Sequence, residues 1–323
     1  MNVALLILNH RHPAQLIRLL NTLRSQLPHS PIIVHHDIYH GEFPSALIEP
    51  IGNVYLLTSG VRMIWGDFSQ VEVCSWSLTW MREHLEFDWM VLLSAQDYPI
   101  KPLAGLADDL ARNDADAVFS ATPIDQLATS AARRTMRRRY FFQYQPAAAD
   151  QPRLLPDGVR DTLRWSTGSL IDTLNILQPL FKIYRLPDRI PYRFGWRAHE
   201  TPFDNDHPCW HGSSWFALSR GGLEYVLDYL ASNPEYMNYY RGTMNPDESM
   251  LATLVFNSPN LRVANRDTTF TRWSNPESGH PDIFGLDDLP ELLAAPQYFA
   301  RKFDIAKDSR ILDRLDDFIR VRV

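Results

Sequence analysis

The chain has 323 residues, of which 45% are hydrophobic and 12% aromatic, which excludes a disordered protein and is ample for a globular core. The net charge of -6 excludes a global positive field that would hold nucleic acid or an anionic membrane. The two cysteines, Cys74 and Cys209, lie far apart, so neither a disulfide framework nor a zinc ribbon is indicated. The first apolar run is too short for a signal peptide or a membrane span, and we expect a cytoplasmic protein.

The first third of the chain alternates short, continuous apolar runs with segments whose apolar residues recur at helical spacing. Continuous apolar strands separated by helices are typical of a parallel sheet that is covered on both faces. The sequence therefore predicts an α/β fold. The predicted strands are 3–8, 31–37, 53–58 and 88–94. One predicted helix begins at Pro13, and a second runs from about Ser69 to Leu85.

Polar residues stand where several of these strands end. In sheets of this kind ligands bind outside the carboxyl ends of the strands. Asn9 and His10 follow the first strand, residues 35–37 end the second, and residues 94–98 end the fourth. They are candidate ligand-binding groups, although each could equally form a turn.

The rest of the chain is less regular at first and then returns to the same pattern. Residues 125–211 are rich in arginine, proline and aromatic residues and predict a long excursion from the sheet, suited to acceptor specificity. The predicted later elements are a strand at 213–218, a helix around 223–230 and an amphipathic terminal helix around 311–319.

Glu248 has two interpretations. Asn245 suits a helix N-cap, Pro246 suits the first helical position, and an acid three residues after the cap can bond to the cap's own N–H. This local pattern favours a structural role. The alternative is a catalytic carboxylate beside Asp247, and the local sequence does not decide between the two.

Arg301 and Lys302 stand between Phe299 and Phe303, which we expect to anchor the backbone against a core. Half-buried cations need an anionic partner. That partner is either a nearby carboxylate, such as Asp304 or Asp308, or a bound diphosphate, for which arginine offers a fork of donors and lysine a compact charge.

Two further clusters are weaker candidates. Asp204 and Asp206 form an Asp-x-Asp pattern with histidine and cysteine close by, but the cluster follows no apolar strand and its ligand types suit no single metal well. The basic and aromatic segment 133–142 would suggest nucleic acid. In an acidic chain we interpret it as a solvated face or as a surface for an acidic acceptor.

Six stretches, in one order along the chain, share the motifs of a known family. They are VHHD (34–37), IWGDFSQVEV (64–73), DWMVLLSAQDYPIKP (88–102), GSSWFALSR (212–220), NPDESMLATLVFNSP (245–259) and YFARKFD (298–304). Together they resemble the core-2/I-branching β-1,6-N-acetylglucosaminyltransferase and peptide O-xylosyltransferase family, glycosyltransferase family 14. They cover most of the chain except roughly 120–210, and it is the joint match that is specific.

The resemblance implies a GT-A-like fold, with a Rossmann-type, mostly parallel sheet flanked by helices and an irregular insertion. It implies an inverting transfer of a sugar, GlcNAc or xylose, from a UDP-sugar to an acceptor hydroxyl without a divalent metal. We expect a single domain, with a nucleotide-binding half at 1–120, a variable acceptor-side insertion at about 121–211 and a catalytic half at 212–323.

The resemblance also implies roles for individual residues. Glu248 is the catalytic base, Arg301 and Lys302 neutralise the leaving diphosphate, and His35 and Asp37 lie at the nucleotide site. The residues expected on the donor and acceptor side are Asp97, Trp65, Ser213, Trp215 and Asp247. Trp65, Trp215 and Trp273 are alternatively core residues, which is the favoured interpretation of each.

Departures from the family set the remaining expectations. Animal members carry a membrane anchor and several disulfides, so this chain resembles a soluble, bacterial-type relative that meets a glycan or glycolipid acceptor, with no nucleic acid and at most peripheral membrane contact. Two rivals stay open. One is a metal-dependent enzyme that uses Asp204 and Asp206, and the other is a catalytically silent glycan-binding protein of the same fold.

Overall fold

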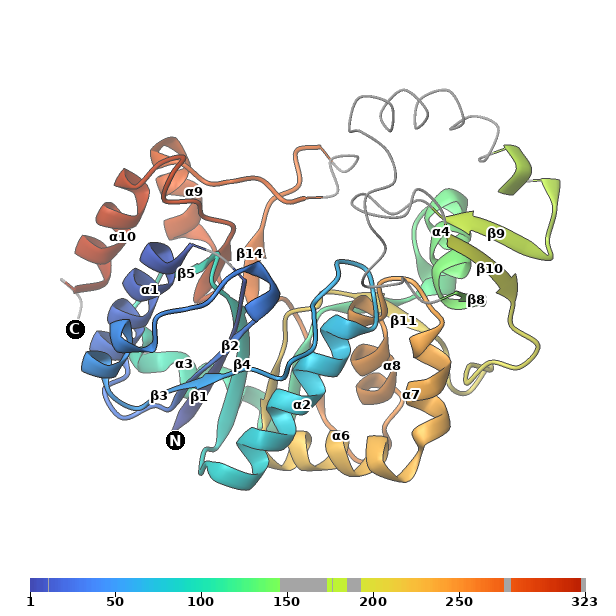
Figure 1. Cartoon of the computed structure of the whole chain (residues 1–323), viewed down its shortest axis with the longest axis horizontal. Coiled ribbons are helices and arrows are strands. Elements are labelled where there is room, and N and C mark those ends of the chain that lie inside the picture. Colours follow the sequence, from blue (N-terminus) through green and yellow to red (C-terminus); the bar gives the residue numbers. More distant parts are fainter. Residues whose placement is uncertain (11, 146–172, 176, 185–192, 276–279, 321–323) are drawn as a thin grey trace.

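The computed structural model describes residues 1–10, 12–145, 173–175, 177–184, 193–275 and 280–320. A seven-stranded sheet carries helices on both faces (Figure 1). No helix in these ranges is long and apolar enough to cross a bilayer. The strands are β1 (Val3–Asn9), β2 (Ile32–His36), β3 (Val54–Leu57), β4 (Trp89–Ser94), β5 (Asp97–Pro99), β6 (Ala117–Phe119), β7 (Ala121–Pro123), β8 (Phe142–Tyr144), β9 (Phe181–Tyr184), β10 (Arg193–Arg197), β11 (Trp210–Gly212), β12 (Ala217–Ser219), β13 (Val263–Asn265), β14 (Thr269–Thr271) and β15 (Phe299–Arg301). The helices are α1 (Pro13–Gln26), α2 (Ser69–His84), α3 (Leu106–Leu110), α4 (Ser130–Tyr140), α6 (Arg220–Ser232), α7 (Pro234–Arg241), α8 (Met250–Phe256), α9 (Leu289–Ala294) and α10 (Arg310–Arg320).

The large sheet has the order β13-β6-β12-β4-β1-β2-β3. Every neighbouring pair is parallel except those of β12, which runs antiparallel to both β4 and β6. The predicted α/β architecture, with a mostly parallel sheet and flanking helices, is confirmed. Because β12 is reversed, the residues just before it emerge at the edge where the other strands end.

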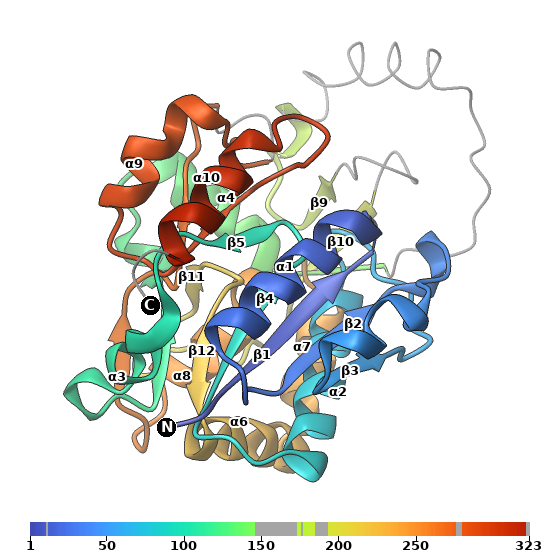
Figure 2. The same ribbon diagram turned by 90° about the vertical axis from the view of Figure 1, so that its left-hand side faces the viewer.

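The two helical layers explain why the strands are apolar throughout. In β1, Val3, Leu5 and Ile7 join the core that α1 and α10 cover, whereas Ala4 and Leu6 join the core that α2, α6 and α8 cover. Successive side chains of a strand point to opposite faces, so both sets must be apolar when both faces are buried. Figure 2 shows α1 and α10 lying over the side of the sheet that faces the viewer.

The early elements were predicted within a residue or two, and two later ones differ. The strand expected at 213–218 is limited to β12, because the Ser213 N–H bonds to the carbonyl of Ser120, directly after β6, and the Trp215 N–H bonds to the Ser213 side chain. The helix expected from Asn245 is a short 3₁₀ turn, Pro246–Glu248, followed by α8. Of the predicted acceptor-side insertion, residues 146–172, 176 and 185–192 lie outside the described ranges.

The described residues also form three small sheets: β14-β15-β5, β8-β10-β9 and β11-β7. The first of these brings the C-terminal part of the chain to the end of β4. A two-residue turn separates the end of β4 from β5, and β5 pairs antiparallel with β15 so that Asp97 lies opposite Arg301.

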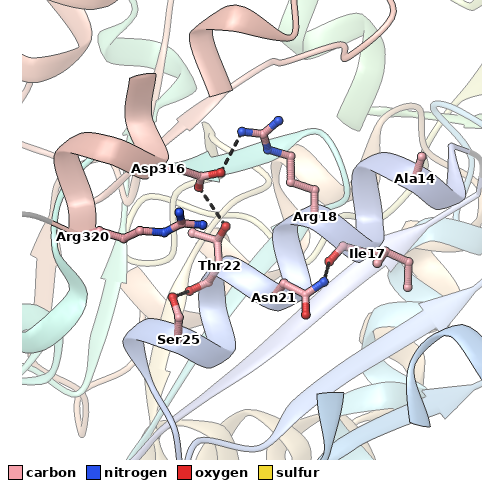
Figure 3. A pocket seen from close by; sticks show the side chains of 8 residues that line it. All are labelled: Ala14, Ile17, Arg18, Asn21, Thr22, Ser25, Asp316 and Arg320. Atoms are coloured by element: carbon pink, nitrogen blue, oxygen red, sulfur yellow. Dashed lines mark hydrogen bonds and ion pairs between the residues drawn. The ribbon is translucent and has the colours of Figure 1, made fainter. Parts of the chain in front are cut away.

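A polar network fastens the last helix to the first (Figure 3). The Asp316 carboxylate on α10 accepts hydrogen bonds from the Tyr98 hydroxyl at 2.7 Å, the Thr22 hydroxyl at 2.9 Å and the Arg18 guanidinium at 2.7 Å. The network borders a hollow of about 390 Å³ between α1 and α10, which none of the predicted site residues lines.

We expect Asp316→Ala to lower the free energy of unfolding by about 1–3 kcal/mol, because the buried Tyr98 hydroxyl loses an acceptor. Asp313→Ala is the matched control. Asp313 pairs with the same arginine but is 61% exposed against 11% for Asp316, so its loss should cost less than about 1 kcal/mol. Urea unfolding measures both, and equal losses would show that the network does not fasten α10.

Candidate active site

Glu248 does not cap a helix. It ends the turn that precedes α8, and the N–H of Asn245 donates to the Gly66 carbonyl at 3.0 Å, so it is not available to the Glu248 carboxylate. Neither Asn245 nor Ser249 makes a side-chain capping bond. The capping interpretation is therefore wrong, and the carboxylate is directed to other partners.

These partners are polar and come from two distant segments. Arg139 Nη1 lies 2.5 Å from Glu248 Oε2, and His211 Nδ1 lies 3.8 Å from the same oxygen. Burial raises the pKa of Glu248 to about 7, with Arg139 opposing and the adjacent Asp247 adding to the shift. Burial and the Arg139 charge lower the pKa of His211 to about 4, so its ring is neutral at pH 7. Since 27% of the Glu248 side chain stays exposed, a ligand can reach the carboxylate.

Asp247 is held by Ser214, which follows Ser213, one of the residues predicted on the donor and acceptor side. The Ser214 hydroxyl donates to Asp247 Oδ2 at 2.8 Å, whereas Oδ1 is buried with no hydrogen-bond partner among the described residues. Burial raises the pKa of Asp247 and the Ser214 bond lowers it. Ser213 Oγ accepts the N–H of Trp215 at 3.1 Å.

A glycine brings this segment close to the sheet. The Ser213 N–H donates to the carbonyl of Ser120, directly after β6, at 2.8 Å. A Cβ at Gly212 would lie 1.9 Å from that carbonyl oxygen, so a side chain there would force the strands apart. Gly212 therefore sets how near residues 213–215 stand to the strand ends.

Arg301 is a half-buried cation at the same edge. Its Nε lies 3.2 Å from Asp97 Oδ1, although the two atoms are not aligned for a hydrogen bond. Its guanidinium carbon lies 4.1 Å from the centre of the Trp215 ring, a cation–π contact. Burial raises the pKa of Asp97 to about 6, and the Arg301 charge opposes that shift. The partner of Arg301 is thus Asp97, not Asp304 or Asp308.

Lys302 follows Arg301 and is half-buried. Its backbone N–H donates to the carbonyl of Asp282 at 3.2 Å, and its carbonyl accepts from the N–H of Phe284 at 3.0 Å. These bonds fix the backbone of the pair predicted to meet a diphosphate.

His35 and Asp37 lie at the end of β2 and are buried. His35 Nε2 accepts the N–H of Ser59 at 3.1 Å, which places the ring proton on Nδ1, and Nδ1 has no hydrogen-bond partner in the described chain. Burial lowers the pKa of His35 to about 4, so the ring is neutral. Asp37 accepts the N–H groups of Tyr39 at 2.9 Å and Met63 at 3.0 Å.

The loop of residues 58–68 connects these residues to Glu248. Met63 bonds to Asp37, and three residues later the Gly66 carbonyl accepts from Asn245, next to the turn that carries Glu248. Trp65 lies between these two bonds and is 39% exposed. Trp273 is 50% exposed, so the core interpretation is wrong for both, while Trp215 is half-buried against Arg301.

The Asp-x-Asp cluster is a surface turn. Asp204 Oδ1 accepts the N–H groups of Asp206 at 2.8 Å and His207 at 2.7 Å, and the Asp204 side chain is 66% exposed. Within the described ranges, no group of three or more His, Cys, Asp and Glu side chains is placed to hold a metal ion. The member of this cluster that joins the site is His211.

Contacts therefore unite Asp97, Arg301 and Trp215, and separately Ser214, Asp247, Glu248 and Arg139, at one edge of the sheet. Sequence reasoning missed Ser214, Arg139 and His211. Ser214 lies next to Ser213, which the sequence did single out, and His211 was noted only as part of the Asp-x-Asp cluster. Arg139 stood in the basic segment, where the solvated-face interpretation is wrong for it.

Comparisons with known proteins agree with the motifs. A model of the Core-2/I-Branching enzyme family matches residues 147–293. Beta-glucuronosyltransferase GlcAT14A of Arabidopsis thaliana is 23% identical over 240 residues, which are 73% of this chain and 44% of the plant protein. Xylosyltransferase 2 of Bos taurus is 29% identical over 147 residues, which are 38% of this chain and 16% of the bovine protein. The chain thus spans less than half the length of these relatives, and the resemblance to the Core-2/I-branching family is confirmed.

Among solved structures, the galactosyltransferase LgtC in complex with donor and acceptor sugar analogues aligns over 99% of this chain and 96% of its own. The TM-score is 0.43 and the sequence identity is 11%.

We expect Ser214→Ala to lower the free energy of unfolding by about 1–3 kcal/mol at pH 8, because the bond is made to a charged group. The Ser214 bond lowers the pKa of Asp247, so it stabilises the fold while Asp247 is ionised, and this stabilisation is lost as the pH falls through the pKa of Asp247. Urea unfolding at pH 8 and at pH 4 measures the difference. Ser213→Ala, which removes an acceptor of a neutral N–H, is the control and should show no such pH dependence. Equal losses for Ser214→Ala at both pH values would contradict the assignment.

Proposed function

We propose that this chain, which resembles the Core-2/I-branching enzymes, is an inverting glycosyltransferase that moves a sugar from a UDP-sugar to an acceptor hydroxyl without a divalent metal. The observation that carries the proposal is the half-exposed Glu248 carboxylate, whose pKa of about 7 suits a general base at neutral pH. The names of the relatives, a glucuronosyltransferase and a xylosyltransferase, add glucuronic acid to GlcNAc and xylose as candidate donor sugars.

The proposed reaction is a single displacement. The acceptor oxygen attacks the anomeric carbon of the donor sugar while its proton passes to Glu248, and the bond from that carbon to the diphosphate of UDP breaks with its electron pair. Because the nucleophile enters opposite the leaving group, the configuration at the anomeric carbon inverts. One base and one means of stabilising the leaving group are required.

Arg301 supplies the stabilisation in this proposal, with Lys302 beside it. Its guanidinium is held between the Trp215 ring and Asp97, and it keeps a buried Nε–H that no described residue accepts. A fixed cation aimed at the developing charge of the diphosphate costs little reorganisation and does what a metal does in other enzymes. His35 and Asp37 hold the nucleotide, and Trp65 borders the donor and acceptor space.

The metal-dependent alternative has weaker support. It requires Asp204 and Asp206 to turn their carboxylates to a metal, and Asp204 already accepts two backbone N–H groups of its own turn. Activity that survives EDTA would support the proposal. Complete loss that manganese restores would overturn its metal-independent part.

Glu248→Gln should lower kcat/KM for the best donor of a UDP-sugar panel by about 10²–10⁴, because the acceptor hydroxyl loses its base. In the wild type, kcat/KM should fall tenfold per pH unit below about 7, where Glu248 becomes protonated. Glu72→Gln is the control, since Glu72 pairs with Arg241 on the surface. Full turnover by Glu248→Gln would remove the base assignment, and glycan binding without turnover of any donor by the wild type would favour a binding protein.

Arg301→Met and Lys302→Met should each weaken UDP binding about ten- to a hundredfold in the presence of EDTA, because each removes a charge-assisted contact to the diphosphate. Calorimetric titration with UDP measures this. Arg310→Met, which removes an exposed arginine paired with Asp308, should leave the affinity unchanged. Lys302→Met leaves the contact between Arg301 and Asp97 intact. This variant therefore reports on diphosphate binding if Arg301→Met does not fold. Unchanged affinity in Lys302→Met would contradict the assignment.

A further inference from the structure

Arg139 reaches the proposed base from a distant part of the chain. It lies in the last turn of α4, 109 residues before Glu248, and its Nη1 donates to Glu248 Oε2 at 2.5 Å. The Arg139 side chain is 17% exposed. An ion pair this close and this sheltered from water is worth more than a surface pair.

The backbone around the pair is fixed on both sides. The N–H of Met244, four residues before Glu248, donates to the Arg139 carbonyl at 3.1 Å. The Tyr239 hydroxyl donates to the carbonyl of Tyr140 at 2.7 Å, and the Tyr140 hydroxyl donates to the backbone carbonyl of Asn245 at 3.4 Å. The end of α4 is thus bound to the segment that carries Glu248, so the side chains meet in a set geometry.

Within the described chain, the ionisable groups that face Glu248 are Arg139, Asp247, His211 and Tyr140. His211 is neutral, because burial and Arg139 lower its pKa to about 4. Tyr140 is neutral as well, because burial raises its pKa well above its ordinary value. Arg139 is therefore the cation in this set that offsets the burial of Glu248 and the charge of Asp247.

We propose that Arg139 is a positioning residue for the base: its ion pair holds Glu248 ionised at Oε2 and so leaves Oε1 to take the proton of the acceptor hydroxyl. The proposal rests on the proposed function. During the displacement, the O–H bond of the acceptor breaks, its proton bonds to Oε1, and the acceptor oxygen bonds to the anomeric carbon as UDP departs. The neutral carboxylic acid that results is attracted less by Arg139, and it returns its proton to solvent before the next turnover.

The test is a direct titration of Glu248 in the folded protein by infrared difference spectroscopy, with the band assigned by its loss in Glu248→Gln. Arg139→Gln should raise the pKa of Glu248 by about 1–3 units, the usual effect of removing an adjacent opposite charge. The acidic limb of the kcat/KM profile should move upward by the same amount. At pH values above the raised pKa most of the activity should return, which a purely structural role would not allow.

Two further variants sharpen the test. Arg139→Lys keeps a cation and should show a smaller shift, and it decides the question if Arg139→Gln does not fold. Arg137→Gln is the matched control, because Arg137 lies on the same helix and pairs with the exposed Asp125, so the pKa of Glu248 should not change.

Two outcomes would overturn the proposal. One is an unchanged pKa of Glu248 in folded Arg139→Gln, and the other is an equal loss of activity at every pH. If the wild type turns over no UDP-sugar, the proposed function fails, while the titration still shows whether Arg139 sets the ionisation of Glu248. The two failures are therefore distinguishable.

Discussion

The contact of Arg301 with Asp97 is the constraint on which the rest of the site depends. Asp97 lies three residues beyond the end of the central strand β4, and Arg301 comes from the C-terminal part of the chain, in a strand paired with β5. A buried carboxylate and a half-buried cation are each costly alone and tolerable together. Their pairing holds the cation at the strand ends, against Trp215, while the same edge receives Glu248 from the opposite helical layer.

The parts of the fold that follow from the period of apolar residues could be predicted from the sequence. The strands β1, β2 and β4 and the helices α1, α2 and α10 are apolar on the faces that the sheet requires, because each is buried by many neighbours. The turn at Pro246–Glu248 could not be predicted in this way. Its local residues suit a helix start, but the backbone of Asn245 bonds to Gly66, a partner that lies 179 residues earlier in the chain.

The residues of the candidate site also fall into those that the sequence predicts and those that it does not. Residues beside a strand end or inside a recognisable motif, such as His35, Asp97 and Arg301, could be selected from the sequence. Arg139 could not, because a basic helix on the surface and a basic helix whose last turn meets a carboxylate have the same sequence pattern. Ser213 and Ser214 are the same residue type side by side, and only their contacts in the fold tell them apart: Ser214 bonds to Asp247 and Ser213 to the Trp215 N–H.

The pairing of β7 with β11 has a consequence for how such a protein diversifies. The two strands close the segment from 124 to 209 at its base, as Ile124 also bonds to Cys209 at 2.9 Å. Because the entropy of closing a loop grows only slowly with its length, evolution can lengthen, shorten or rewrite what lies between these strands without moving the strand ends. The end of α4 is the exception, because its bonds to residues 244 and 248 fix its position within a segment that is otherwise open to change. A change in the residues between the two strands therefore need not displace the strand ends at which the candidate site lies.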